Sequence, residues 1–535
     1  MKEQFSGHRM YFPQYRIGRA GIEIFDGTIL EHAQRLGIPI EAECGGKGTC
    51  GGCVVRAGKG SEALSDLTPT EREGDLGEGE RLACQATVTG EADITVYIVS
   101  AGEYTILSDS VRNRVEVKPA VRRRGERVVW NWAKVERELG NYQGAIYGLA
   151  VDVGTTTLVC EVLDLQSGEP LATVARKNPQ SAYGDDVISR IDYTIRNEGG
   201  LQRLQQSVVS CINEILQELA ESDEIDPELI YEVVAVGNPT MRNILFGLDV
   251  ASLGVIPFEA PDTAPVNERA KNLGLQVNRE ANVYGPALLG GHAGADCLAD
   301  IIAARMHEAD RPCMIIDIGT NGEVAVGNAE KIMTASCAAG GAYEGATVTS
   351  GVGAIAGAIS NVTINDGEIT FETIASQAPV GICGSGLIDL LAQLLKAGIM
   401  TPKAKLEGDF YLTDDIRLTQ QDVYELITAK AGLRTDQDLL LDYYGIEPEE
   451  VDKIYLAGGF GNFIDGANAA AIGLLPDLQD RIVKIGNAAL AGAAELLLST
   501  DLRRASEECA RSVEHTRPNE REPEFDFIVA ENMYF

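Results

Sequence analysis

Four cysteines near the N-terminus have a spacing that suits electron-transfer chemistry. Cys44, Cys50 and Cys53 are separated by five and then by two residues, and Cys84 follows after thirty more. Four thiolates can hold the two irons of a [2Fe–2S] cluster. The segment around the first three cysteines is rich in glycine, so its backbone can wrap closely and aim amides at the cluster sulfurs. The pattern therefore predicts an iron–sulfur cluster of the 2Fe-2S kind, with these four cysteines as its ligands.

Two other uses of these cysteines are weighed against the cluster. A structural zinc site also takes four thiolates, but usually as two close pairs and without this density of glycine. A thioredoxin-like redox pair of Cys50 and Cys53 would leave Cys44 and Cys84 without a role. The seven other cysteines lie scattered, mostly in apolar or Gly/Ala-rich segments, where cysteine is most often a small buried hydrophobe.

The elements that must position the cysteines follow from the hydrophobic pattern. Residues 16–25 alternate and are rich in Ile, which predicts a strand, and residues 26–28 supply a turn and a cap. Helical apolar spacing over residues 29–36 then ends at a glycine. Further strands are expected at residues 54–55 and 86–99. This order of strands, helix and cysteine loop predicts a small β-grasp fold.

The first hundred residues resemble a known class of electron carrier. The five-residue first gap, together with Arg81-Leu82-Ala83-Cys84, is similar to the adrenodoxin and putidaredoxin type of ferredoxin. The resemblance covers roughly residues 8–98. It implies electron transfer through the cluster and leaves the electron acceptor open.

Two segments farther along the chain each pair an apolar strand with an Asp–Gly–hydroxyl turn. They are residues 147–157 and 314–323, about 165 residues apart. Glycine permits a tight hairpin, threonine hydroxyls and loop amides can hold phosphate oxygens, and an Asp can bind hydrated Mg²⁺ or orient the attacking water. Two such turns predict a duplicated fold with phosphates clamped between its halves. The residues that they offer are Asp152, Gly154, Thr155, Thr156, Asp317, Gly319, Thr320 and Asn321.

Glycine and alanine define three further segments of this region. A strand at residues 454–457 runs into Gly458, Gly459 and Gly461, where a bare backbone could lie against an adenosine. Residues 286–296 and 486–493 consist mostly of small residues. Such segments allow two helices to cross closely, and we expect them at a hinge between the two halves.

These elements, in this order, resemble the actin/Hsp70/sugar-kinase superfamily of nucleotide-binding folds. Its phosphate 1 motif matches Asp152, Gly154 and Thr155, and its phosphate 2 motif matches Asp317, Gly319 and Thr320. The adenosine motif matches the glycines at 458, 459 and 461. The resemblance implies a two-lobed actin-like ATPase fold that binds ATP and Mg²⁺ in a cleft between lobes, with Asp152 and Asp317 as the catalytic residues.

The whole chain resembles the reductive activators of corrinoid-dependent enzymes, which combine the same two parts. The narrower resemblance rests on residues 178–191, 236–241, 337–345 and 381–389. It implies ATP-dependent reductive activation of a corrinoid protein in a methyltransferase or O-demethylase system. An electron from the [2Fe–2S] cluster would return inactive Co(II) to Co(I). It also implies an unidentified low-potential electron donor and a homodimer.

Two other functions remain open at this point. One is a small-molecule kinase with a redox-sensing ferredoxin, for which no acceptor-binding motif stands out. The other is an electron-transfer module whose nucleotide domain senses but does not hydrolyse. The intact Asp152 and Asp317 oppose this last interpretation.

Composition bounds the class and the surroundings of the protein. The chain has 535 residues, 45% of them hydrophobic, and a net charge of −35 from 45 Lys+Arg against 80 Asp+Glu. Such a surface opposes nucleic acid or anionic lipid as a main partner. The N-terminus lacks an apolar signal region, no apolar run is long enough for a membrane helix, and no P-loop motif occurs. We therefore expect a cytoplasmic α/β multidomain enzyme without a membrane partner.

We predict three parts with the following boundaries. Residues 1–98 form the ferredoxin domain, residues 99–144 a linker, and residues 145–535 the ATPase, with lobes near 145–305 and 306–535. The linker contains a basic spot of Arg122, Arg123, Arg124 and Arg127, both tryptophans of the chain, and a segment at 131–139 that could form a short helix. It is either a packing anchor or a basic surface that docks the ferredoxin or an acidic partner.

Overall fold

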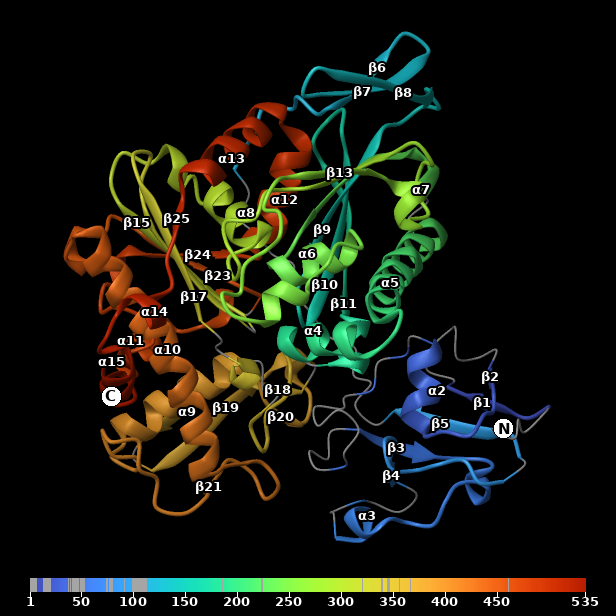
Figure 1. Ribbon diagram of the computed structural model, residues 1–535. Coiled ribbons are helices and arrows are strands. Elements are labelled where there is room, and N and C mark those ends of the chain that lie inside the picture. The colour runs from blue at the N-terminus through green and yellow to red at the C-terminus, as the bar shows by residue number, and fades with distance from the viewer. Residues whose placement is uncertain are drawn as a thin grey trace.

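A computed structural model places a small ferredoxin-like unit, a three-stranded sheet and a large two-lobed unit in one chain (Figure 1). It describes residues 7–12, 21–36, 38, 40, 48, 53–73, 76, 80–90, 92–98, 113–184, 186–222, 225–319, 321–337, 340–343, 347–355, 357–365, 367–459 and 461–535. All structural statements concern these residues. None of the helices among them combines the length and the apolar character that crossing a bilayer requires.

The N-terminal unit is a five-stranded sheet covered by helix α2, as the β-grasp prediction requires. The strand order is β2-β1-β5-β3-β4. Met10, Phe12 and Ile24 are fully buried in its core together with Ile29 and Ala33 of α2. The elements are β1 (Arg9–Tyr11), β2 (Ile22–Glu23), α2 (Ile29–Leu36), β3 (Val54–Ala57), α3 (Pro69–Glu73), β4 (Glu80–Leu82) and β5 (Ile94–Ile98).

Helix α2 begins where the sequence predicts it, because Thr28 and Glu31 cap it reciprocally. The Thr28 hydroxyl accepts from the Glu31 amide at 3.2 Å, and the Glu31 carboxylate accepts from the Thr28 amide at 2.8 Å. These two bonds satisfy donors that a helix start leaves free.

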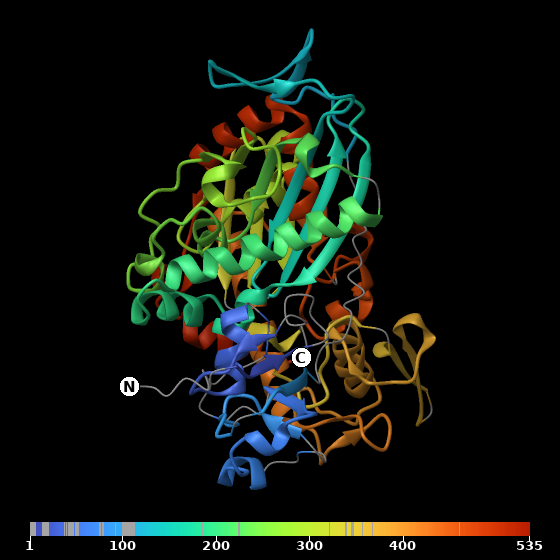
Figure 2. The same ribbon diagram turned by 90° about the vertical axis from the view of Figure 1, so that its right-hand side faces the viewer.

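The expected linker contains a folded sheet of three antiparallel strands. These are β6 (Val121–Arg124), β7 (Arg127–Trp132) and β8 (Val135–Asn141), in the order β6-β7-β8. The short helix expected at residues 131–139 is therefore wrong. Trp130 is buried and donates its indole N–H to Glu232 at 3.0 Å. The sheet is thus anchored on the large unit, at the end of the molecule opposite the ferredoxin-like unit (Figures 1 and 2).

The large unit contains the same five-strand arrangement twice, which confirms the predicted duplication. The orders are β11-β10-β9-β12-β14 in the first lobe and β17-β16-β15-β23-β24 in the second, each extended by one edge strand. In both, the first strand pairs antiparallel with its hairpin partner and parallel with the strand on its other side. The two Asp–Gly–hydroxyl turns therefore occupy equivalent places, after β9 and after β15.

The first lobe consists of a six-stranded sheet and five helices among the described residues. Its strands are β9 (Tyr147–Val153), β10 (Thr157–Asp164), β11 (Pro170–Lys177), β12 (Ile230–Val236), β13 (Val266–Arg269) and β14 (Asn282–Gly285). Its helices are α4 (Val187–Arg196), α5 (Gly200–Ser222), α6 (Pro239–Leu245), α7 (Ala270–Leu273) and α8 (Ala295–Ala303), with a 3-10 turn η2 at Pro179–Tyr183.

The second lobe adds a small subdomain to its sheet. The sheet contains β15 (Cys313–Ile318), β16 (Gly322–Gly327), β17 (Ile332–Cys337), β23 (Ile454–Ala457), β24 (Ile482–Gly486) and β25 (Glu514–His515). The smaller strands are β18 (Ala358–Asn365), β19 (Glu368–Thr373), β20 (Gly381–Ile382), β21 (Phe410–Tyr411) and β22 (Arg417–Leu418). The helices are α9 (Gly384–Lys396), α10 (Gln420–Tyr444), α11 (Gly466–Ala471), α12 (Ala488–Leu498), α13 (Thr500–Ser512), α14 (Pro518–Arg521) and α15 (Phe525–Asn532).

Helices α8 and α12 cross closely between the two sheets (Figure 1). A Cβ added to Gly492 would lie 2.2 Å from the Ala299 carbonyl oxygen, so the crossing requires a glycine there. Every residue of α12 is buried, which explains its content of alanine and leucine. The segment at 486–493 thus lies at a close crossing, as the sequence predicts, whereas most of residues 286–296 precede α8 and Ala299 lies beyond them.

Candidate functional site

Two of the four predicted cluster ligands lie in the described part of the chain, and they converge. The Sγ atoms of Cys53 and Cys84 are 3.3 Å apart, and both side chains are buried. The Ala83 backbone amide donates to the Cys53 carbonyl at 2.8 Å, and the side-chain Nε2 of Gln85 lies 3.5 Å from the Cys84 sulfur. Two convergent thiols with nearby N–H donors fit the ligand set of an iron–sulfur cluster. Cys44 and Cys50 lie outside the described residues.

The turn after β9 is tight and held from behind. A Cβ on Gly154 would lie 2.6 Å from the Thr157 carbonyl oxygen, so this position needs glycine. The Thr155 hydroxyl accepts from the Asn238 side-chain amide at 3.0 Å. The Gly154 carbonyl accepts from the Asn178 side chain at 2.7 Å. These bonds hold the turn through the Gly154 carbonyl and the Thr155 hydroxyl.

A fully buried arginine braces the same turn. Arg190, on α4, donates to the Thr155 carbonyl at 2.7 Å, to the Gly184 carbonyl at 2.8 Å and to the Gln180 side chain at 3.2 Å. Sequence reasoning included Arg190 in a family motif but gave it no role. Its three acceptors come from two segments, the turn after β9 and the η2 segment with its C-cap Gly184, which the sequence does not bring together.

The turn after β15 packs against the glycine turn after β23. The Gly319 amide donates to the Asn321 carbonyl at 3.1 Å, which closes the turn, while Thr320 lies outside the described residues. Gly458 has a left-handed φ of +101°, and a Cβ there would lie 2.5 Å from the Ile318 carbonyl oxygen and 2.7 Å from Asp317 Oδ1. The Gly461 amide donates to the Gly458 carbonyl at 3.0 Å, and Gly459 faces open space. Asp317 and the predicted adenosine turn are therefore neighbours.

The two predicted catalytic carboxylates influence each other across the lobes. Burial and then the charge of Asp317 raise the pKa of Asp152 to about 7, although a hydrogen bond from Asn487 opposes the shift. Asn487 caps α12 and donates to Asp152 Oδ2 at 2.9 Å. A buried acid with a pKa near neutrality is typical of a site that binds a cation or moves a proton.

Three further acids surround this pair, and sequence reasoning missed them. Burial and the charges of Asp152 and Asp317 raise the pKa of Asp296 to about 7. Burial and neighbouring carboxylates also raise the pKa values of Asp300 and Glu323 well above their ordinary range. Asp296 and Asp300 are four residues apart on α8, which places them on one helix face. That spacing is the signal that could have found them.

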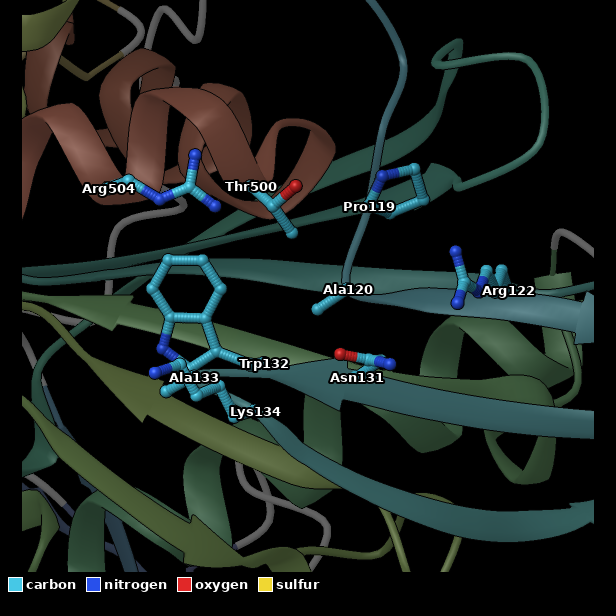
Figure 3. Close-up of a pocket in the computed structure, with 9 residues that line it drawn as sticks. All are labelled: Pro119, Ala120, Arg122, Asn131, Trp132, Ala133, Lys134, Thr500 and Arg504. Carbon is cyan, nitrogen blue, oxygen red and sulfur yellow. The ribbon is translucent and has the colours of Figure 1, made fainter.

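A separate pocket of about 370 Å³ lies beside the β6–β8 sheet and contains no residue of the two turns. Figure 3 shows its lining, which comes from the chain before β6, from β7 and the turn to β8, and from α13. Its cationic residues are Arg122, Lys134 and Arg504. In this structure the basic surface lies at the end of the molecule opposite the described part of the ferredoxin-like unit (Figure 2).

Models of known families match nearly the whole chain. Residues 311–535 match the C-terminal domain of RACo, the ASKHA domain, and residues 147–309 match the RACo middle region. Residues 19–89 match the 2Fe-2S iron-sulfur cluster binding domain.

Full-length relatives agree with these matches. The chain is 31% identical to the corrinoid activation enzyme RamQ of Eubacterium limosum, over 87% of this chain and 89% of the relative. It is 27% identical to the Co(II) methylated amine-specific corrinoid protein reductase of Methanosarcina barkeri, over 66% of this chain and 70% of the relative. The solved structure of a reductive activator for corrinoid, iron-sulfur protein superposes with a TM-score of 0.73 at 27% identity, covering 99% of this chain and 98% of that one. The chain therefore belongs to the family of RACo-type corrinoid activators, in which a 2Fe-2S ferredoxin is fused to an ASKHA ATPase domain.

Proposed function

We propose that this protein uses ATP to drive low-potential electrons onto the cobalt of a corrinoid protein, converting inactive Co(II) to Co(I). The observation that carries the proposal is the presence in one chain of two kinds of site. One is the convergent thiol pair of Cys53 and Cys84, and the other is a pair of acid-bearing turns on facing lobes. The family assignment favours this function over the kinase and the non-hydrolysing sensor.

The proposed roles of the residues follow from their positions. When bound, the [2Fe–2S] cluster supplies one electron at a time at low potential. Cys53 and Cys84 would hold it with Cys44 and Cys50. The turn amides beyond Gly154 and Gly319 would bind the phosphates of ATP, with Thr155, Thr156, Thr320 and Asn321. The glycines at 458, 459 and 461 would face the adenosine.

Asp152 and Asp317 would hold a hydrated Mg²⁺ or orient the attacking water. Mg²⁺ prefers carboxylate and water oxygens, and here it would also balance the negative charge of the acid cluster. A cation between the lobes favours the ionised form of both carboxylates. Bound Mg²⁺–ATP would therefore draw the two lobes together.

The energy that ATP must supply is modest. For a one-electron transfer a potential gap of about 59 mV is a factor of ten, so a gap of about 120 mV costs roughly 100-fold, or about 2.7 kcal/mol. Allosteric couplings of about 1–3 kcal/mol are typical. Closure of the lobes on ATP can therefore offset such a gap, provided that ATP binds the two states of the protein unequally.

The surroundings of the reaction are part of the proposal. We place the protein in the cytoplasm, where thiols stay reduced, with an unidentified low-potential protein as electron donor. Resemblance to the family supports a homodimer, which sedimentation equilibrium would test. The corrinoid protein belongs to a methyltransferase or O-demethylase system, and the chain leaves the methyl donor open.

The test is the appearance of Co(I) in the visible spectrum of a Co(II) corrinoid protein. The anaerobically reduced protein is mixed with its partner, with and without ATP and Mg²⁺. We expect Co(I) only with ATP, and none with Cys53→Ser or Asp317→Asn. Cys211→Ser, which alters a cysteine of α5 in the first lobe, is the matched control and should behave as the wild type. ATP consumption without any change at cobalt, across several corrinoid partners, would contradict the proposal and favour a kinase.

A further inference from the structure

The ferredoxin-like unit touches the first lobe through a reciprocal pair of hydrogen bonds. The Tyr183 hydroxyl donates to the Gln34 carbonyl at 2.7 Å, and the Gln34 side-chain amide donates to the Ala182 carbonyl at 2.5 Å. Gln34 belongs to α2, whereas Ala182 and Tyr183 belong to η2. Figure 1 shows α2 below and to the right of α4, which follows η2 in the chain. Among the described residues, the contact made by these two bonds is polar.

On its other side, η2 is bonded to the turn that follows β9. Asn178 caps η2 through the Gln180 amide at 3.0 Å, and the same side chain donates to the Gly154 carbonyl at 2.7 Å. Arg190 joins Gln180 of η2 to the Thr155 carbonyl. A shift of this turn around a bound phosphate must therefore be transmitted to η2, since buried side chains connect the two.

On the ferredoxin side, α2 is bonded to the segment that carries Cys84. The Leu30 amide donates to the Ala83 carbonyl at 2.9 Å, and the Ile29 amide donates to the Ala86 carbonyl at 3.0 Å. The helix is rigidly seated, because His32 and Ala33 are fully buried in the ferredoxin core. One helix thus contacts both the cluster segment and the first lobe.

We propose that η2 is the docking surface of the chain's own ferredoxin unit, and that nucleotide in the cleft changes how firmly the unit docks. This inference rests on the proposed function, because it takes the turn after β9 as a phosphate-binding turn. Coupling between two sites is reciprocal, so docking also changes the affinity for nucleotide. A polar contact between domains suits a contact that forms and releases during a cycle.

The test is hydrogen–deuterium exchange of the complete, cluster-loaded protein under anaerobic conditions. Tyr183→Phe removes the hydroxyl that holds Gln34, and Gln34→Ala removes the reciprocal donor while keeping a good helix former. Tyr193→Phe is the matched control. Its ring centroid lies 4.9 Å from that of Tyr183, but its hydroxyl accepts from Arg203 within the first lobe.

We expect exchange over residues 29–36 and 179–184 to become about three- to tenfold faster in Tyr183→Phe and in Gln34→Ala, as loss of one hydrogen bond implies. Tyr193→Phe should match the wild type, and the visible spectrum of the cluster should be retained in all three. Equal exchange in all four proteins would overturn the docking surface.

A second part of the same experiment tests the coupling between nucleotide binding and docking of the ferredoxin-like unit. Addition of a non-hydrolysable ATP analogue with Mg²⁺ should change exchange over residues 29–36 at least threefold in the wild type, and this change should vanish in Tyr183→Phe. An analogue that binds but leaves these residues unchanged would overturn the coupling. No corrinoid protein is present, so this result is separate from failure of the cobalt assay.

Discussion

Asn487 Nδ2 lies 2.9 Å from Asp152 Oδ2, while Asn487 Oδ1 accepts from the Leu490 amide at 2.8 Å. One side chain therefore starts α12 and also holds a carboxylate of the opposite lobe. Serine is an equally good helix cap but is too short to keep the bond to Asp152. Asn487→Ser and Asn487→Ala thus separate the two roles.

We expect both Asn487 variants to lose about tenfold or more in kcat/KM for ATP hydrolysis, because a hydrogen bond to a charged group is lost. Only Asn487→Ala should also lose about 1 kcal/mol of stability, from the missing cap. Phosphate release and thermal unfolding measure the two effects. Full activity in Asn487→Ser would show that the bond to Asp152 has no part in hydrolysis.

Gly458 and Gly459 are adjacent but differ in what a methyl group would meet. At Gly458 the φ of +101° and the Ile318 carbonyl oxygen, 2.5 Å from an added Cβ, both exclude alanine. At Gly459 an added Cβ meets nothing within 4 Å. Gly458→Ala should therefore lower the unfolding midpoint by several degrees and abolish detectable ATP binding, as measured by calorimetry. Gly459→Ala should unfold at the wild-type temperature, and equal destabilisation of both variants would contradict this geometry.

Arg503 and Glu232 form an ion pair at 2.8 Å in which both side chains are fully buried. Removing one partner leaves an uncompensated buried charge, so Arg503→Met should cost about 3–5 kcal/mol. The double variant Arg503→Met/Glu232→Gln removes both charges and should recover much of that loss. Calorimetric unfolding of the four proteins in a double-mutant cycle checks this. Additive losses would show that the pair is not coupled.

The buried His515 side chain should make the folded protein less stable in mild acid. Burial, followed by the charges of His292 and Arg517, lowers the pKa of His515 to about 4. Its Nδ1 lies 3.1 Å from the Thr334 hydroxyl, and its buried Nε2 has no partner among the described residues. In the unfolded chain this histidine has a pKa near 6.5. Between about pH 6.5 and pH 4 the unfolded chain therefore binds a proton that the folded protein does not bind.

Stability from this group should therefore be complete above about pH 6.5 and fall as the pH drops, by at most about 1.4 kcal/mol per pH unit. His515→Gln removes the titrating group. The difference between the unfolding midpoints of wild type and variant should shrink from pH 7.5 to pH 5.5. A constant difference would contradict the shifted pKa.

Local patterns predicted the fold well. The capped helix at 29–36 and the two turns after β9 and β15 each depend on a few adjacent residues, and the structure confirms them. The helix expected at 131–139 failed for a physical reason. Glu and Arg favour a helix there. However, Trp130 and Trp132 both lie on one face of β7, and β8 pairs antiparallel with β7 along its length. Packing overrode a weak local propensity.

Only those site residues that belong to a recognisable local segment could be predicted from the sequence. Asp152 and Asp317 are visible in sequence because each lies near the end of an apolar strand, two residues before a glycine. Arg190 is not, since its role exists only after separate segments have come together around it. Contacts between residues far apart in the chain produce no motif of fixed spacing in the sequence.

The contact of Gly492 with the Ala299 carbonyl has a mechanical consequence. Backbone meets backbone there, with no side chain that could change rotamer to absorb a displacement. The crossing can therefore serve as a fixed pivot between the lobes, about five residues, or roughly 7.5 Å along α12, from Asn487. A single methyl group added at Gly492 would push α8 and α12 apart, and with them the two lobes whose turns we propose to bind the phosphates.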